Sequence, residues 1–404
     1  MTKPDPAPRQ GVLPRLRSLP LLALILWGAA IPAAVPAAAQ APAAKPEPPA
    51  AAQPAAPAAE PAGAAPQMMP VERVPFYHDW AQSPHAKADA QAFNNWNEQG
   101  EIPEACARCH STPGFLDYIG ADGSAPGVVD KKAPTGSLIG CSACHNETTR
   151  MMTSVTFPST LRVENLGADA RCMTCHQGRT AGATVDAAVA GRDEDTVVPE
   201  LEFINVHYRA AGATLMGTLA RGGYEYPGRA YASARNHPGP FNSCTTCHEL
   251  HTVAPKSEPC AACHDGVSNR ESLASIRKGK IDFDGNGNVT EGIAVEIATL
   301  HERLLAAIRA YAVDTAGAPI GYDGHAHPYF FNDSDGDGAI SEAEAQGTNK
   351  YASWTPRLLK AAYNYQFVAK DPGAYAHNAP YVIQLMHDSL ADLAEANVAG
   401  LTRP

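Results

Sequence analysis

All ten cysteines of the chain occur in one repeated pattern, Cys-x-x-Cys-His. Two thiols separated by two residues can lie one helical turn apart on the same side of the chain, and the histidine that follows adds a nitrogen ligand beside them. No cysteine is left over. We number the five copies motifs 1 to 5 in chain order: Cys106–His110, Cys141–His145, Cys172–His176, Cys244–His248 and Cys260–His264.

Several kinds of chemistry use paired cysteines. A Cys-x-x-Cys pair could be half of a zinc site or a thioredoxin-like redox pair, and ten cysteines in a secreted protein could form five disulfides. Neither zinc nor disulfides require a histidine after every pair. Attachment of haem c does, because the two thiols bond to the vinyl groups of one haem and the histidine becomes the proximal iron ligand. The pattern predicts five haems c, covalently bound at Cys106, Cys109, Cys141, Cys144, Cys172, Cys175, Cys244, Cys247, Cys260 and Cys263, with proximal ligands His110, His145, His176, His248 and His264.

On these motifs, the chain from about His78 to His264 resembles the multihaem c-type cytochromes, which are secreted electron-transfer proteins. A weaker similarity lies in His-Asn-Ala-Pro-Tyr at His377, which resembles a segment that supplies a distal haem ligand in several such cytochromes. The resemblance implies a fold that is mostly α-helix with extensive loops, wrapped around covalent haems, with little or no β-sheet.

Five irons that are each held by two histidines need five distal ligands. The chain has 15 histidines, so ten remain after the proximal five. Local context favours His85, His207, His237, His251 and His377 as distal ligands, with His207 in a helix-like stretch over residues 206–220. His78 is held in reserve, His301 and His387 are expected to be structural, and His325 and His327 are left open. A methionine ligand would raise a potential, but a packing role is expected for Met151, Met152, Met216 and Met386.

A twelve-residue segment that starts at Asp333 fits the EF-hand calcium loop. Carboxylates alternate at positions 1, 3 and 5, a glycine stands at position 6 and a glutamate at position 12. This spacing suits a hard cation that prefers oxygen ligands. The predicted calcium ligands are Asp333, Asp335, Asp337, Ala339 through its carbonyl, Ser341 and Glu344.

An imperfect copy of this loop begins 51 residues earlier and supplies Asp282, Asp284, Asn286 and Asn288. Its position 12 is Ile293, so the bidentate glutamate is missing, and Glu291 or Glu296 could substitute for it. We expect weaker calcium binding here, or a loop that no longer binds. Wherever calcium binds, a structural role is expected.

The N-terminal region is expected to direct secretion. Residues 1–40 combine basic residues, the apolar run 21–31 and small residues at 37–39, which is typical of a signal peptide. If this leader were uncleaved, it would be the expected membrane contact. Residues 41–70, rich in alanine and proline, are expected to be a disordered linker, followed by a five-haem core (71–280) and a helical region with the calcium loops that completes it (281–404).

Composition limits the remaining functions. The net charge of −11 argues against nucleic-acid partners, and aromatic residues make up only 7% of the 404 residues, so we expect haems to replace much of the side-chain core. The leading hypothesis is an electron carrier in the periplasm, outside the cell or at its surface, with redox proteins such as other cytochromes or membrane quinol oxidoreductases as partners. Assembly into a homo-oligomer or filament is left open. The alternative is an oxidoreductase that reduces or oxidises a small nitrogen or sulfur oxyanion at one haem with an open site.

Overall fold

Short helices connected by long loops make up the first part of the chain, because glycine, proline and small polar residues interrupt nearly every helical stretch there. The computed structural model describes residues 73–404, which belong to one compact unit. The predicted signal peptide and linker lie outside the described residues. The α-helices up to motif 5 are α1 (Tyr77–Gln82), α2 (Gln91–Asn94), α3 (Glu104–His110), α4 (Thr112–Tyr118), α5 (Cys141–Cys144), α6 (Glu147–Met151), α7 (Asp169–Met173), α8 (Gly182–Val189), α9 (Ala211–Met216), α10 (Cys244–Cys247) and α11 (Glu258–Ala261).

The β-structure is limited to three antiparallel two-stranded ladders in the described chain. They pair β1 (Glu101–Ile102) with β2 (Ala133–Pro134), β3 (Val155–Thr156) with β4 (Arg162–Val163), and β5 (Ile320–Tyr322) with β6 (Phe330–Asn332). The 3-10 turns are η2 (Pro84–Ala86), η3 (Gly217–Leu219), η4 (Glu271–Ser275), η5 (Gly347–Asn349) and η6 (Glu395–Val398). The predicted fold class, mostly α with extensive loops, is confirmed.

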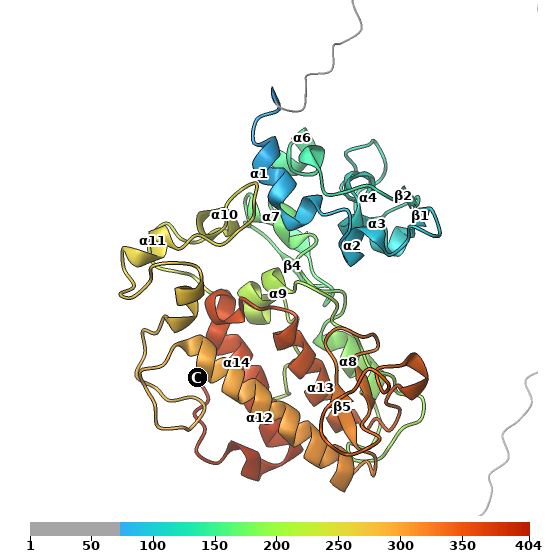
Figure 1. Ribbon diagram of the computed structural model, residues 1–404, viewed down its shortest axis with the longest axis vertical. Coiled ribbons are helices and arrows are strands. Elements are labelled where there is room, and N and C mark those ends of the chain that lie inside the picture. The colour runs from blue at the N-terminus through green and yellow to red at the C-terminus, as the bar shows by residue number, and fades with distance from the viewer. Residues whose placement is uncertain (1–72) are drawn as a thin grey trace, which may run out of the picture. The chain divides into compact units, whose positions relative to one another are not determined.

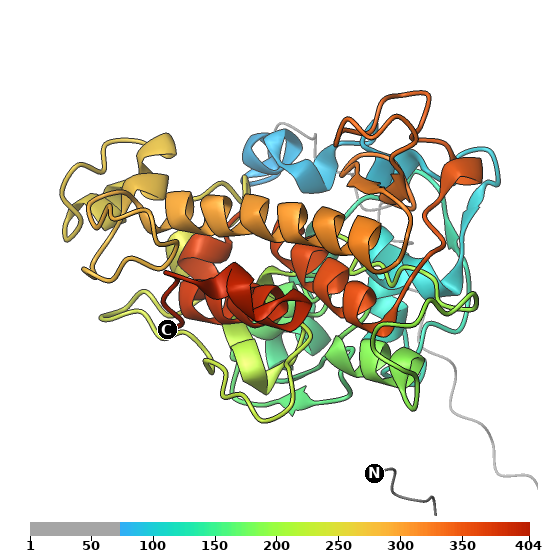
Figure 2. The ribbon, with the colours of Figure 1, turned by 90° about the horizontal axis from the view of Figure 1, so that it is seen from below.

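Three long helices, α12 (Ile293–Asp314), α13 (Pro356–Ala369) and α14 (Ala374–Leu393), pack side by side in the C-terminal part (Figures 1 and 2). Thr355 caps α13 by accepting a hydrogen bond from the Leu358 N–H at 3.1 Å, and Pro356 occupies the first helical position. Gly292 precedes α12, where a Cβ would lie 2.0 Å from the Ala274 carbonyl oxygen. In Figure 1 the motif-bearing helices α3, α7, α10 and α11 lie on one side of these three helices.

A large side-chain core surrounds α12, α13 and α14, which differs from the expectation that haems would replace it. Trp354, Tyr363, Tyr381, Phe330 and Phe367 are all at most 1% exposed in this core. The average aromatic content did not predict this core, because the buried aromatic residues are concentrated in the last quarter of the chain. The C-terminal helices therefore have apolar burial of their own to stabilise them.

Helix α14 is kinked near its start. Asn378 has non-helical dihedral angles (φ −164°, ψ 74°), and Pro380 follows inside the helix. Proline removes one backbone donor and its ring clashes with the preceding turn, so a kink is expected there. The Asn378 side-chain amide donates to the Ser233 carbonyl at 2.9 Å, which fixes the kink directly after His377.

Within residues 73–404, no helix combines the length and apolar character that crossing a bilayer requires.

Candidate haem sites

Each Cys-x-x-Cys-His motif begins on a short helix, so that its two cysteines are one turn apart. Motifs 1 to 5 lie on α3, α5, α7, α10 and α11 respectively. No disulfide joins any of the ten cysteines in the described chain. A thiol pair on one helical turn, followed by an imidazole, is the donor set that covalent haem attachment requires, so the residues present fit haem c.

The structure brings each of the five predicted distal histidines to a different proximal histidine. The ring-centroid separations and interplanar angles are 5.8 Å and 73° for His110–His207, 6.3 Å and 9° for His145–His251, 6.2 Å and 48° for His176–His85, 6.4 Å and 28° for His248–His377, and 6.1 Å and 57° for His264–His237. We number each pair after the motif that supplies its proximal histidine, so that His110–His207 is pair 1 and His264–His237 is pair 5.

These separations match the space that a metal needs between two imidazoles. Two metal–nitrogen bonds of about 2.0 Å, with about 1.1 Å more from each nitrogen to its ring centre, place the centroids roughly 6 Å apart. Imidazoles in direct contact stack much closer, as the 3.9 Å between the rings of His301 and Tyr365 illustrates. The five pairs are therefore spaced to hold an atom between them.

Hydrogen bonds to Nδ1 orient several of the paired rings and leave Nε2 available to a metal. His110 Nδ1 lies 2.7 Å from the Ala92 carbonyl oxygen, His248 Nδ1 lies 3.0 Å from that of Val253, and His237 Nδ1 lies 2.8 Å from that of Pro238. Such contacts fix the tautomer and the ring direction of metal-binding histidines.

The fourth of these hydrogen-bonded rings, His377, has a charged partner. Its Nδ1 lies 2.8 Å from Oδ2 of Asp371, a residue that is only 3% exposed. Asp371 is not predictable from spacing, because a position six residues before a histidine belongs to no helical or motif pattern. A buried aspartate at the end of an apolar helix is the signal that could have indicated it.

His207 occupies a turn and does not lie in the helix expected over residues 206–220. The helix is confined to α9, because His207 (φ 67°) and Arg209 (φ 61°) both adopt left-handed backbone conformations. The Asn205 side chain accepts a hydrogen bond from the His207 N–H at 2.8 Å. A left-handed, non-glycine conformation is uncommon and here positions a pair-forming side chain.

Burial lowers the pKa of five of the ten paired rings and so favours the neutral imidazole, which is the form that binds a metal. It lowers the pKa of His176 to about 4, with His85 adding to the effect, and lowers that of His207 to about 4, with His110 adding to it. Burial acts on His377 in the same direction, but the charge and hydrogen bond of Asp371 more than reverse it and raise the pKa of His377.

The other five histidines pair with no proximal histidine within the described chain. His301 donates from Nε2 to the Tyr365 carbonyl at 2.8 Å, and His387 lies 3.4 Å from Asp388. These contacts fit the structural roles predicted for both. The remaining three, His78, His325 and His327, are exposed.

Thiols from different motifs lie next to one another. The Cys109 thiol of motif 1 lies next to Cys175 of motif 3, whose thiol contacts the Arg108 carbonyl at 3.6 Å, and Cys172 of motif 3 lies next to Cys244 of motif 4. Cys144 of motif 2 also lies near Cys172, and Cys247 of motif 4 lies near Cys260 of motif 5. Motif 3 is thus the centre of the network, adjacent to motifs 1, 2 and 4, with motif 5 at the end of one branch.

Comparison with known proteins points to the same chemistry. Residues 91–177, which include motifs 1 to 3, match the family described as cytochrome c7 and related cytochrome c. The C-type polyheme cytochrome OmcB of Geobacter sulfurreducens is 29% identical over 356 residues, covering 74% of this chain and 45% of that protein. OmcC, another C-type polyheme cytochrome of that species, is 26% identical over 367 residues, covering 76% of this chain and 44% of its own length. These matches support a multihaem c-type cytochrome.

The chain spans less than half the length of the polyheme cytochromes that it resembles. No solved structure matches it.

The chain also holds three aspartates together in the loop predicted to bind calcium. Carboxylate oxygens of Asp333, Asp335 and Asp337 lie within 4.8 Å of one another. The Gly338 N–H donates to Asp333 at 2.9 Å, and Gly338 has a φ of 83°, which explains the glycine at the sharp turn. Glu344 lies outside the cluster, and accepts hydrogen bonds from the Ser334 N–H at 2.7 Å and from the Ser341 N–H at 3.0 Å.

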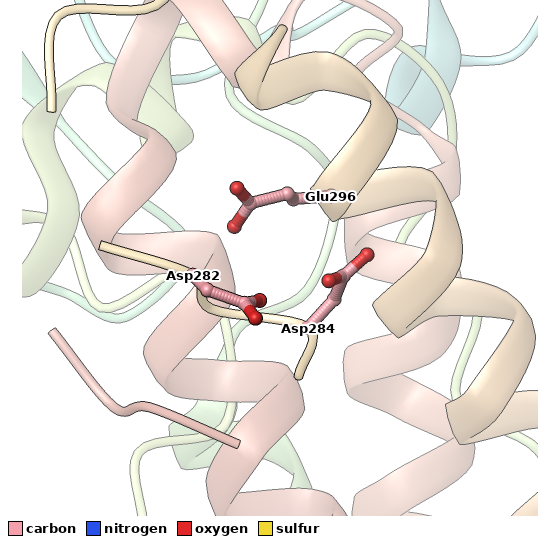
Figure 3. Close-up of side chains that lie close together, drawn as sticks. All are labelled: Asp282, Asp284 and Glu296. Atoms are coloured by element: carbon pink, nitrogen blue, oxygen red, sulfur yellow. The ribbon is translucent and has the colours of Figure 1, made fainter. Parts of the chain in front are cut away.

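The imperfect loop is completed by a residue from the following helix. Carboxylate oxygens of Asp282, Asp284 and Glu296 lie within 4.8 Å of one another, and Figure 3 shows the three side chains directed toward a common space. Glu296 is fully buried, pairs with Arg277, and accepts the Phe283 N–H at 2.8 Å. Of the two substitutes considered for position 12, Glu296 joins the cluster, whereas Glu291 accepts from the Asn286 side chain at 2.6 Å.

Proposed function

We propose that this cytochrome binds five haems c, each held between the two histidines of one pair, and transfers electrons outside the cytoplasm. The observation that carries the proposal is that every proximal histidine has one distal partner at 5.8–6.4 Å, contributed by a different part of the chain. The proposed distal ligands are His207, His251, His85, His377 and His237 for sites 1 to 5 in turn.

Bound haem would supply an iron that alternates between two oxidation states, with a potential set by its ligands and surroundings. The chain itself attaches, orients and partly buries the five groups. The thiol contacts support a path from site 1 through site 3 to sites 4 and 5, with site 2 branching from site 3. Such adjacency suits electron transfer along the network rather than at isolated sites.

The alternative, an oxidoreductase for a small nitrogen or sulfur oxyanion, has less support. That chemistry needs one iron with an open or labile position, whereas all five proximal histidines have a partner ring among the described residues. An open site would have to arise by loss of a distal ligand.

Secretion and calcium binding belong to the same proposal. The signal-like residues 1–40 support export to the periplasm or cell surface, where redox proteins, such as other cytochromes or membrane quinol oxidoreductases, would be the partners. We propose that the Asp333 loop binds calcium as a structural ion through Asp333, Asp335 and Asp337, with Ala339, Ser341 and Glu344 completing the ligands after adjustment of the loop. Abundant external calcium would suit an affinity of about 10⁻⁴–10⁻³ M.

The test is the haem content and visible spectrum of the mature protein, reduced with dithionite, before and after carbon monoxide. Five haems per chain and no spectral change with carbon monoxide are expected, because every iron would have two ligands. Fewer haems would overturn the count. A change equivalent to one haem would reveal an open site and favour the oxidoreductase.

A further inference from the structure

Two adjacent buried residues of opposite charge follow helix α13, and each lies near a different histidine pair. Lys370 and Asp371 are both 3% exposed. They form no ion pair with each other in the described chain. Instead, Asp371 contacts His377 of pair 4, whereas Lys370 contacts Tyr208, the residue that follows His207 of pair 1.

The Asp371 carboxylate is held firmly against the ring of pair 4. His377 Nδ1 lies 2.9 Å from Oδ1 and 2.8 Å from Oδ2, and the Gly373 N–H donates to Oδ1 at 3.2 Å. Where Nδ1 of another paired histidine has a hydrogen-bond partner in the described chain, that partner is a neutral backbone carbonyl. A carboxylate makes the imidazole a more basic ligand and places negative charge nearby, so it stabilises ferric over ferrous iron.

The Lys370 ammonium is enclosed by aromatic rings instead of carboxylates. Its nitrogen lies 3.6 Å from the ring centroid of Tyr208 and 4.2 Å from that of Tyr329. The Tyr208 hydroxyl donates to the Gly324 carbonyl at 3.1 Å, which holds the ring in place, and the rings of Tyr208 and His207 are 5.8 Å apart. Cation–π contacts stabilise the ammonium without neutralising it, so its positive charge acts on pair 1 and favours ferrous iron there.

The two affected pairs are separated by only one other site. Motif 4 contacts motif 3 through Cys244 and Cys172, and motif 3 contacts motif 1 through Cys175 and Cys109. A difference in potential between pairs 4 and 1 therefore acts along a short stretch of the proposed path.

We propose that Lys370 and Asp371 are positioning residues that shift the potentials of sites 1 and 4 in opposite directions, so that an electron moves from site 4 through site 3 and rests at site 1. This inference rests on the proposed function, because it needs iron in both sites. It assigns a direction to electron transfer that the ligand pairs alone do not provide.

The test is a redox titration of the fully loaded protein followed by electron paramagnetic resonance. The rings of pair 1 are inclined by 73° and those of pair 4 by 28°, so the two ferric signals are expected to differ in shape. Asp371→Asn keeps a hydrogen-bond acceptor but removes the charge, and Lys370→Gln removes the charge of the ammonium. We expect D371N to raise the site 4 potential and K370Q to lower the site 1 potential, each by about tenfold in the electron-sharing equilibrium, or about 59 mV for a one-electron couple.

Two matched variants control for simple structural damage. Lys370→Arg keeps the charge and is expected to leave site 1 within about twofold of the unmodified protein. Asp388→Asn removes another buried carboxylate on α14, beside His387, which pairs with no proximal histidine in the described chain, and is expected to leave site 4 unchanged.

Haem content and the carbon monoxide test on each variant distinguish failure of this inference from failure of the proposed function. If unmodified protein has five doubly ligated haems but D371N and K370Q move neither potential, or move both in one direction, the inference is wrong. If D371N loses its haem at site 4, the inference is tested by K370Q alone: a lower site 1 potential supports it, and an unchanged one contradicts it. Absence of five such haems in unmodified protein would instead contradict the proposed function.

Discussion

The ring planes of His145 and His251 are nearly parallel, inclined by 9°, with centroids 6.3 Å apart. The ring of Phe76 stacks on that of His251, with centroids 4.4 Å apart and planes inclined by 7°. Stacking restricts rotation of the His251 ring about its bond to the chain. The relative orientation of the two imidazoles in pair 2 is therefore set by packing outside the site.

Ring orientation predicts two classes of electron paramagnetic resonance signal in the oxidised protein. Pairs 2 and 4 are inclined by 9° and 28°, whereas pairs 1, 3 and 5 are inclined by 48–73°. Ligand planes that are nearly parallel and planes that are strongly inclined give low-spin ferric signals of different shape. We expect the class with nearly parallel rings and the class with inclined rings to have integrated intensities in the ratio two to three. A His251→Ala variant should lose intensity from the nearly parallel class and bind carbon monoxide at one haem. Loss from the inclined class would contradict the assigned pairing.

Replacing a distal histidine by methionine should raise the potential of one site. We expect His207→Met to move one-fifth of the redox titration to higher potential, because methionine–histidine ligation favours ferrous iron. Spectroelectrochemistry measures the shift. His78→Met, at an exposed histidine, serves as the control and should leave the titration unchanged. An unchanged titration for His207→Met would show that His207 is not a ligand.

Calcium is expected to stabilise the protein through the Asp333 loop. At about 10 mM calcium, an affinity of 10⁻⁴–10⁻³ M would add about 1.4–2.7 kcal/mol to the free energy of unfolding. Thermal melts with calcium or with a chelator measure this gain. A double substitution, D335N with D337N, should abolish most of it, whereas Ser334→Ala in the same loop should not. The corresponding pair D282N with D284N tests what the other loop contributes.

Acid should weaken the C-terminal helices through His301. Burial lowers the pKa of His301 to about 4, opposed in part by its hydrogen bond to Tyr365, whereas an unfolded histidine titrates near 6.5. As the pH falls below about 6.5, the unfolded chain takes up a proton at this histidine that the folded chain does not. The free energy of unfolding therefore decreases between about pH 6.5 and pH 4. The loss between pH 7.5 and pH 5 is about 2 kcal/mol. Denaturant midpoints should show a shallower pH dependence in His301→Gln, while His325→Gln, at an exposed site, should follow the unmodified protein.

The start of helix α12 should not tolerate a side chain at position 292. A Cβ on Gly292 would lie 2.0 Å from the Ala274 carbonyl oxygen, and backbone cannot move aside as a flexible side chain can. We expect Gly292→Ala to cost about 1–3 kcal/mol of unfolding free energy. Gly347→Ala meets nothing within 4 Å and should be nearly neutral in the same denaturation experiment. Equal effects would show that the close approach to Ala274 does not cause the loss.

Local spacing was sufficient to predict the attachment motifs, because covalent haem chemistry needs residues that are adjacent in sequence. The distal histidines could be selected by context, but not assigned to their sites: motif 2 is paired with His251, which directly follows motif 4. Such assignments depend on how distant segments pack, which no local pattern encodes. The same is true of Asp371, whose partner depends on a kink in another helix.

In the calcium loops, too, residues placed by local sequence were predictable, whereas residues placed by packing were not. Alternating aspartates predicted the cluster at Asp333, Asp335 and Asp337 because neighbouring side chains in one turn form it. The place of Glu296 was only one of two possibilities, since it requires the first turn of α12 to fold back onto the loop. The aromatic core was missed because its residues are sparse overall but concentrated in one region.

The contact between Cys109 and Cys175 constrains the order of biosynthesis. Before haem is attached, contact with Cys175 lowers the pKa of Cys109 to about 6, which favours the thiolate, the nucleophilic form. A chain that collapsed in an oxidising compartment at this stage would hold Cys109 against a thiol of another motif, where an oxidant could join the two in a disulfide. The proposed haem attachment is therefore expected to come before compaction, on an extended polypeptide whose motifs are still far apart.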